Sequence, residues 1–105
     1  TLGITKIRYA DVMYIKSLGD FSNIYTIQNS KHVTLVSLKN MERQMPASTF
    51  MRVHKQYIVN LKHITTITGT DIHLFNKQIV PISPAYRQDL LDKVVNKKVF
   101  TRFAE

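Results

Sequence analysis

The sequence contains no cysteine, and only three glycines and three prolines stand among its 105 residues. Without cysteine, disulfide bonds and thiolate metal sites are excluded. No apolar run approaches the roughly 20 residues of a membrane-spanning helix, and no signal peptide is visible. The glycines, at positions 3, 19 and 69, are too far apart for a glycine-rich phosphate loop. We therefore expect a cytoplasmic protein, not one embedded in a membrane.

Acidic residues are also scarce. Seven carboxylates stand against fifteen lysines and arginines, so the formal charge is +8 and the pI about 9.9. Such an excess favours an anionic partner, either nucleic acid or a membrane surface. No acid lies between Glu42 and Asp71. That window nevertheless carries Arg43, Arg52, His54, Lys55, Lys62 and His63. The positive field should be strongest there.

The sequence shows no pattern typical of a catalytic or metal site. Most acids fall at positions typical of turns or helix faces, and no nucleophile motif is present. The histidines lie far apart, without carboxylates at metal-ligand spacing. They are His32, His54, His63 and His73. We therefore expect no enzyme, no metal and no cofactor.

The length predicts one domain, residues 1–105, and 44% apolar residues can bury a modest core. β-branched and aromatic residues occur in short runs separated by turn residues, which predicts a mostly β fold. The predicted strands cover 6–9, 12–17, 22–28, 32–36, 52–59, 64–68, 72–75 and 78–82.

Two short helices complete the prediction. Ser37 is expected to cap a helix over 38–45, which Pro46 ends. Ser83 and Pro84 are typical of the start of a second helix. Its apolar stripe is Leu90, Leu91, Val94 and Val95. The expected core covers about 7–95, and 96–105 is a basic tail.

The most informative stretch is Phe50–Leu61, which holds Arg52, His54 and Lys55 within four residues. Arginine and lysine are the side chains that bind phosphate and read guanine edges. The same stretch also fits a solvated basic edge of a buried strand. Two further structural roles are open: a backbone hydrogen bond for His54 and a turn cap for Asn60.

The pattern Phe-x-Arg-x-His-basic-x-aromatic-Ile-Val-Asn-Leu resembles the central motif of LytTR-type DNA-binding domains, the output modules of many bacterial response regulators. Weaker matches at 7–17, 19–25, 37–42 and 81–87 follow in the family's order. The resemblance implies an elongated stack of small antiparallel β-sheets with two short helices. It also implies sequence-specific binding of duplex DNA by loops that enter successive major grooves.

Carried over by position, the resemblance places base readers in a first loop, backbone contacts at the small helix, a central contact at the motif, and one side chain after the closing loop. The corresponding residues are Ser22 and Asn23; Ser37 and Lys39; Arg52, His54, Lys55 and Gln56; and Arg87. Gln56 stands where the family often has serine, and Pro84-Ala85 stands where it often has a basic residue.

The family also suggests partners. They are promoter direct repeats of duplex DNA, bound by a dimer, and a sensor histidine kinase that acts through a receiver domain. Because the chain begins at Thr1, we expect it to be a fragment of a longer regulator.

Two other classes remain open. A single-stranded nucleic-acid or RNA binder would stack bases on aromatic side chains such as Phe21, Tyr25, Tyr57 and Phe75. A protein-interaction module would use its charge only for solubility.

Overall fold

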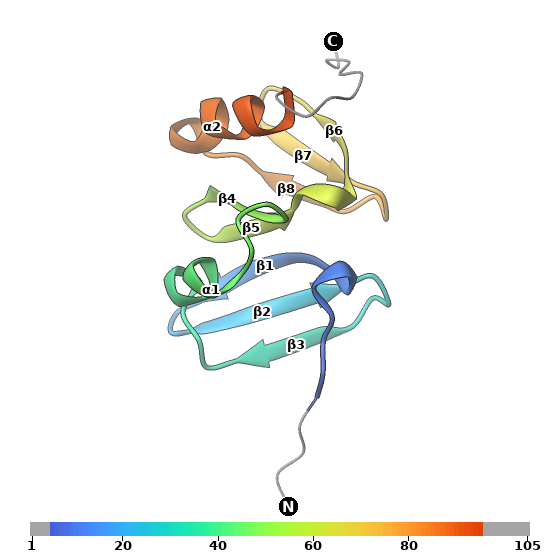
Figure 1. Ribbon diagram of the computed structural model, residues 1–105, viewed down its shortest axis with the longest axis vertical. Coiled ribbons are helices and arrows are strands. Elements are labelled where there is room, and N and C mark those ends of the chain that lie inside the picture. The colour runs from blue at the N-terminus through green and yellow to red at the C-terminus, as the bar shows by residue number, and fades with distance from the viewer. Residues whose placement is uncertain (1–4, 96–105) are drawn as a thin grey trace, which may run out of the picture.

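The protein is described here by a computed structural model covering residues 5–95. Within that range, eight strands form two antiparallel sheets, stacked along the long axis of a body of 51 × 25 × 22 Å (Figure 1). The larger sheet has the order β3-β2-β1-β5-β4 and the smaller one β6-β7-β8. Two α-helices flank the sheets. The predicted fold class, mostly β with an elongated stack of small antiparallel sheets and two short helices, is confirmed.

The larger sheet comprises β1 (Val12–Leu18), β2 (Phe21–Thr26), β3 (Lys31–Thr34), β4 (Phe50–His54) and β5 (Tyr57–Asn60). The smaller sheet comprises β6 (Ile64–Ile67), β7 (Asp71–Leu74) and β8 (Ile79–Pro81). The helices are α1 (Leu38–Gln44) and α2 (Pro84–Val95). Helix α1 begins as predicted, because the Ser37 hydroxyl accepts a hydrogen bond from the Asn40 N–H at 3.3 Å. The predicted tail, 96–105, lies outside the described residues.

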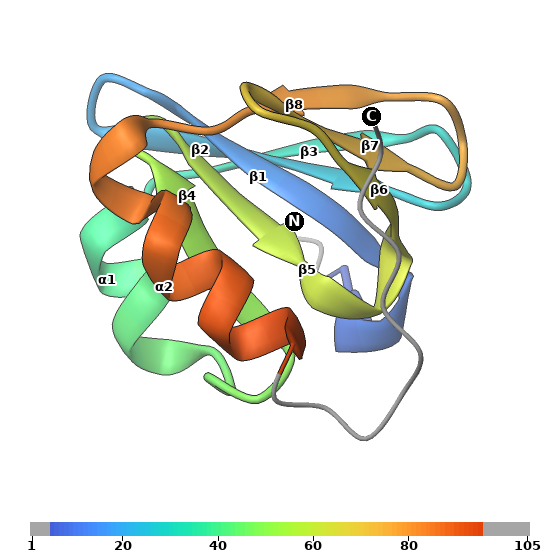
Figure 2. The same ribbon diagram turned by 90° about the horizontal axis from the view of Figure 1, so that it is seen from above.

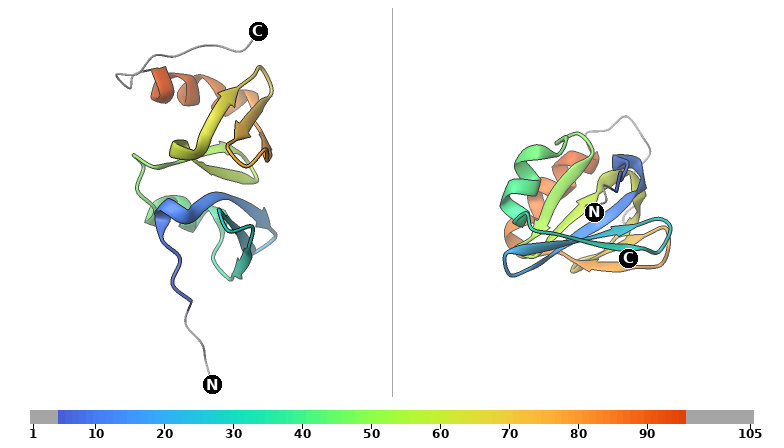
Figure 3. Two further views of the ribbon diagram at one scale, coloured as in Figure 1. Left: turned by 90° about the vertical axis from the view of Figure 1, so that its right-hand side faces the viewer. Right: turned by 90° about the horizontal axis from the view of Figure 1, so that it is seen from below.

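Strands β1, β4 and β5 of the larger sheet contribute to a core on each face; Figures 2 and 3 show the arrangement from other directions. One core lies between this sheet and α1, and it contains Val12, Ile15, Leu38, Met41, Met45, Phe50 and Ile58. The other lies between the two sheets and α2, and it contains Met13, Val53, Val59, Leu61, Ile72, Leu74, Val80, Ile82 and Leu90. The central strands β1 and β5 therefore bury successive residues on opposite sides, which explains their nearly continuous apolar runs.

Two strand predictions are wrong. Residues 6–9 form no strand; Tyr9–Asp11 instead forms a 3-10 helix, and the backbone before it is irregular. The carbonyl of Tyr9 accepts a hydrogen bond from the Asn60 side chain, 51 residues away, so this segment is held by a side chain rather than by a strand partner. Residues 52–59 are not one strand but the hairpin β4–β5, with Lys55 and Gln56 at its turn.

Asn60 is the fully buried polar side chain at the end of β5. Its Oδ1 accepts from the Lys62 N–H at 2.9 Å, which confirms the turn cap expected from the sequence. Its Nδ2 donates to the Val12 and Tyr9 carbonyls, at 2.9 and 3.3 Å. Asn60 therefore joins the segment from Tyr9 to Val12 to the end of β5.

Two turns, the start of α2 and helix α1 lie on one edge of the molecule, on the left in Figure 1. The Ser17 N–H donates to the Gln56 carbonyl at 2.9 Å, so the β1–β2 turn lies beside the β4–β5 turn. The Ser83 N–H donates to the Val53 carbonyl at 2.9 Å, which holds the start of α2 beside β4. Helix α1 completes this edge through contacts with β4. We call it the loop edge.

Candidate nucleic-acid interface

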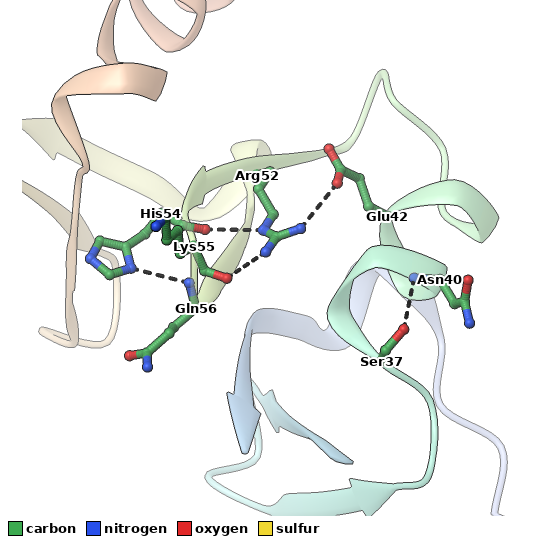
Figure 4. A network of polar contacts seen from close by, with 7 residues as sticks. All are labelled: Ser37, Asn40, Glu42, Arg52, His54, Lys55 and Gln56. Carbon is green, nitrogen blue, oxygen red and sulfur yellow. Dashed lines mark hydrogen bonds and ion pairs between the residues drawn. The ribbon is translucent and has the colours of Figure 1, made fainter. Parts of the chain in front are cut away.

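The β4–β5 turn projects from the middle of the loop edge and is held by the side chains that precede it (Figure 4). Arg52 donates from Nε to the His54 carbonyl at 3.0 Å and from one terminal nitrogen to the Lys55 carbonyl. The Gln56 N–H donates to Nδ1 of His54 at 3.1 Å. Lys55 and Gln56 are exposed at the tip, and the Gln56 side chain points away from the Arg52 guanidinium.

The hydrogen bonding of His54 fixes its tautomer. Because Nδ1 accepts the Gln56 N–H, the ring proton of the neutral imidazole is on Nε2. The ring edge also packs against Tyr57, with 5.6 Å between centroids and 77° between planes. The backbone hydrogen bond expected for His54 is therefore present. Within residues 5–95 its Nε2–H has no partner and remains a donor for a base or a phosphate.

The Arg52 guanidinium is not placed as that of a free phosphate-binding side chain would be. Its remaining terminal nitrogen pairs with Glu42 Oε1 of α1 at 3.3 Å, and only 17% of its side chain is exposed. All three guanidinium nitrogens are therefore engaged within the domain. The sequence predicted that Arg52 contacts DNA, but gave no sign that Glu42 would be its partner.

Ser22 and Asn23 are not in a loop. Both lie in β2 and are buried, because only Gly19 and Asp20 form the β1–β2 turn. The Ser22 hydroxyl donates to the Val36 carbonyl at 2.6 Å. The Asn23 Oδ1 is buried and has no hydrogen-bond partner among the described residues. The predicted placement of both in a first loop is wrong, since both residues pair with β1 and β3 inside the larger sheet.

The remaining predicted residues divide into free and engaged side chains. Ser37 caps α1, and Arg87 donates from Nη1 to the Thr68 carbonyl at 3.0 Å while half-buried. Lys39 is exposed on α1. In the described part of the chain, no partner holds the charged groups of Lys39 and Lys55 or the Gln56 amide.

The sequence did not single out one further cation on this edge. Lys16 pairs with Tyr57 across β1 and β5, and its Nζ lies 5.7 Å from the centre of that ring. It is therefore next to the β4–β5 turn. The only sign of Lys16 in the sequence was its position near the end of a predicted strand, two residues before β1 ends.

The aromatic side chains do not gather into one exposed platform. Tyr14 stacks on Tyr25 at 4.5 Å and lies 6.2 Å from Tyr57, whereas Phe75 contacts His63 beside the smaller sheet. Burial raises the pKa of the Tyr14 phenol, with Tyr25 and Tyr57 adding to the shift. Tyr14 therefore stays protonated at neutral pH.

Two kinds of feature are absent from residues 5–95. No group of three or more histidine, aspartate or glutamate side chains could hold a metal ion. No described helix is both long and apolar enough to cross a membrane.

Comparison with known families decides the class of the domain. The family model for the LytTr DNA-binding domain matches residues 3–94. The chain belongs to the LytTR family. It is thus a DNA-binding domain, as the central motif predicted, and nothing in the fold favours the single-strand or protein-interaction alternatives.

Individual LytTR relatives agree with this assignment. The Sensory transduction protein LytT of Bacillus anthracis is 29% identical over 92 residues, which cover 83% of this chain and 37% of that protein. The CO-responsive transcriptional regulator RcoM of Rhodospirillum rubrum is 34% identical over 55 residues, covering 52% of this chain and 23% of that regulator. The chain thus spans little more than a third of the LytT protein.

A solved LytTr DNA-binding domain from Bacillus cereus has the same fold. It superimposes with a TM-score of 0.78 over 84% of each chain, at 24% identity.

Proposed function

We propose that this LytTR domain binds duplex DNA sequence-specifically through the loop edge, as the output domain of a cytoplasmic transcriptional response regulator, without enzymatic activity. One observation carries the proposal: Lys55 and Gln56 are held at the tip of a braced turn, with no partner among residues 5–95. The relatives named for sensory transduction and transcriptional regulation support the same role.

The dimensions of the domain suit a duplex. Points on the same groove of B-DNA recur about every 34–36 Å along one side of the helix. The domain is 51 Å long, and the loop edge runs along that axis with the β4–β5 turn near its middle (Figure 1). An edge of this length can reach successive major grooves.

The free side chains divide by chemistry. Lys39 and Lys55 supply point charges for phosphates. Gln56 supplies an amide that pairs bidentately with adenine in the major groove, and His54 supplies its Nε2–H. We assign no contact to Ser22 or Asn23, because their side chains are buried. Ser37 and Arg87 hold α1 and the β6–β7 connection in place.

The wider partners follow from the relatives' roles. We propose that a receiver domain in the same protein, controlled by a sensor histidine kinase, governs this domain. We further propose that two domains occupy promoter direct repeats as a dimer on DNA.

Removing the Lys55 ammonium tests the interface. If Lys55 neutralises one phosphate, Lys55→Ala lowers the slope of log affinity against log salt by about 1 and weakens binding to every duplex several-fold. Lys62→Ala is the matched control, because Lys62 is exposed beyond the opposite end of β5. Equal slopes for Lys55→Ala and the unsubstituted domain would remove the turn from the interface.

Selection of bound duplexes from a random pool tests the function as a whole. We expect enrichment of a short motif, and weaker binding to the single strands of that motif. Equal affinity for single strands would contradict the proposal.

A further inference from the structure

Arg52 is placed to organise the turn that carries the free side chains. From β4, its planar guanidinium reaches the carbonyls of both His54 and Lys55. The fixed fork of arginine can satisfy such convergent acceptors, whereas the single ammonium of lysine cannot do so in the same geometry. The Arg52 side chain thus connects the end of β4 to the turn that follows it.

This turn lacks the residues that usually stabilise a reversal. Its tip is Lys55-Gln56, without glycine, proline, asparagine or aspartate. The pairing register between β4 and β5 also shifts between Arg52 and His54, so the backbone there departs from regular hairpin geometry. Hydrogen bonds of the Arg52 and His54 side chains stabilise the turn in place of turn-forming residues.

The same guanidinium also joins the turn to α1. Glu42, 48% exposed, pairs with Arg52 at 3.3 Å. Lys39 lies one turn earlier on this helix. The Glu42–Arg52 pair therefore links α1, which carries Lys39, to the turn that carries Lys55.

We propose that Arg52 is a positioning residue for DNA recognition, which organises the β4–β5 turn and fixes it to α1 without itself neutralising a phosphate. The inference rests on the proposed function of the loop edge. Holding Lys55 and Gln56 in one arrangement before binding lowers the ordering cost at the interface.

Salt titrations separate a positioning residue from a phosphate contact. With a random-sequence duplex and a pool-selected duplex, Arg52→Ala should weaken binding about 5- to 30-fold, since the turn must then be ordered on binding. Its salt slope should change by less than about 0.3, against about 1 for Lys55→Ala. Arg52→Lys keeps the charge but loses the fork, so it should weaken binding as Arg52→Ala does. Full affinity in Arg52→Lys, or a slope reduced by about 1 in Arg52→Ala, would overturn the proposal.

A second readout needs no DNA. In the free domain, Arg52→Lys should speed hydrogen exchange of the Gln56 amide about tenfold, while the Ile72 amide in the smaller sheet stays unchanged as a measure of global stability. Unchanged exchange at Gln56 would refute the positioning role. Faster exchange at Gln56, together with no effect of Lys55→Ala on duplex binding, would refute the proposed DNA interface. It would leave only the role of Arg52 in ordering the turn.

Discussion

A covalently linked tandem of two domains is expected to bind a duplex with two copies of the site about 10²–10⁴-fold more tightly than one domain binds a single site. The side chains that we assign to the DNA contact of one domain are few: Lys39, His54, Lys55 and Gln56. Contacts of this kind are largely electrostatic and lose affinity steeply with salt. A tether raises the effective concentration of the second domain once the first is bound.

The measurement compares the tandem and the single domain on duplexes with one and two sites. On the one-site duplex, linking should add no more than the statistical factor of about two expected for two equivalent domains. Sedimentation should show the free single domain as a monomer at micromolar concentration. A stable free dimer, or a two-site affinity unchanged by linking, would contradict this expectation.

Asn60→Ala should lower the free energy of unfolding by about 2–4 kcal/mol, because buried polar groups lose their partners and a turn loses its cap. The Tyr9 and Val12 carbonyls lose their Nδ2 donor, and the Lys62 N–H loses its acceptor. The side chain is fully buried, so water does not replace these bonds without rearrangement.

Chemical denaturation measures the Asn60 effect. Asn40→Ala is the matched control, since Asn40 is exposed on α1 and its backbone rather than its side chain meets Ser37. The control should change stability by no more than about 0.5 kcal/mol, as surface substitutions usually do. An Asn60→Ala loss as small as the control's would mean that the Asn60 network adds little to stability.

Elements whose ends carry local signals were predictable from the sequence. Ser37 and Pro46 bracket α1, and Pro84 begins α2. The turn residues around Gly69 and Asn76 separate the strands of the smaller sheet. The central motif was sufficient to identify the family, because it combines basic, aromatic and apolar residues in one fixed order.

Elements fixed by side-chain contacts were not predictable. The β4–β5 turn has no turn-forming residue at its tip and depends on Arg52 and His54 side chains. The burial of Ser22 depends on the Val36 carbonyl, 14 residues away. The segment around Tyr9 depends on Asn60. Each involves a contact that strand periodicity cannot show.

Within the predicted site, the sequence pointed to one part of the chain but could not show the role of each side chain. Residue type alone does not distinguish Arg52, whose guanidinium is engaged, from Lys55, whose ammonium has no partner among residues 5–95. Burial and hydrogen-bond partners make that distinction.

Mapping the DNA-contacting edge by NMR tests the central claim most directly. A ¹⁵N-labelled domain is titrated with its pool-selected duplex, and the amides whose shifts move are located on the fold. The loop edge should respond, with the largest changes at Lys55 and Gln56 and further changes at Lys39. The opposite edge, where Asn29 and Asn76 line a pocket, should stay unchanged. Changes centred on Asn29 and Asn76, with Lys55 and Gln56 unmoved, would contradict the account.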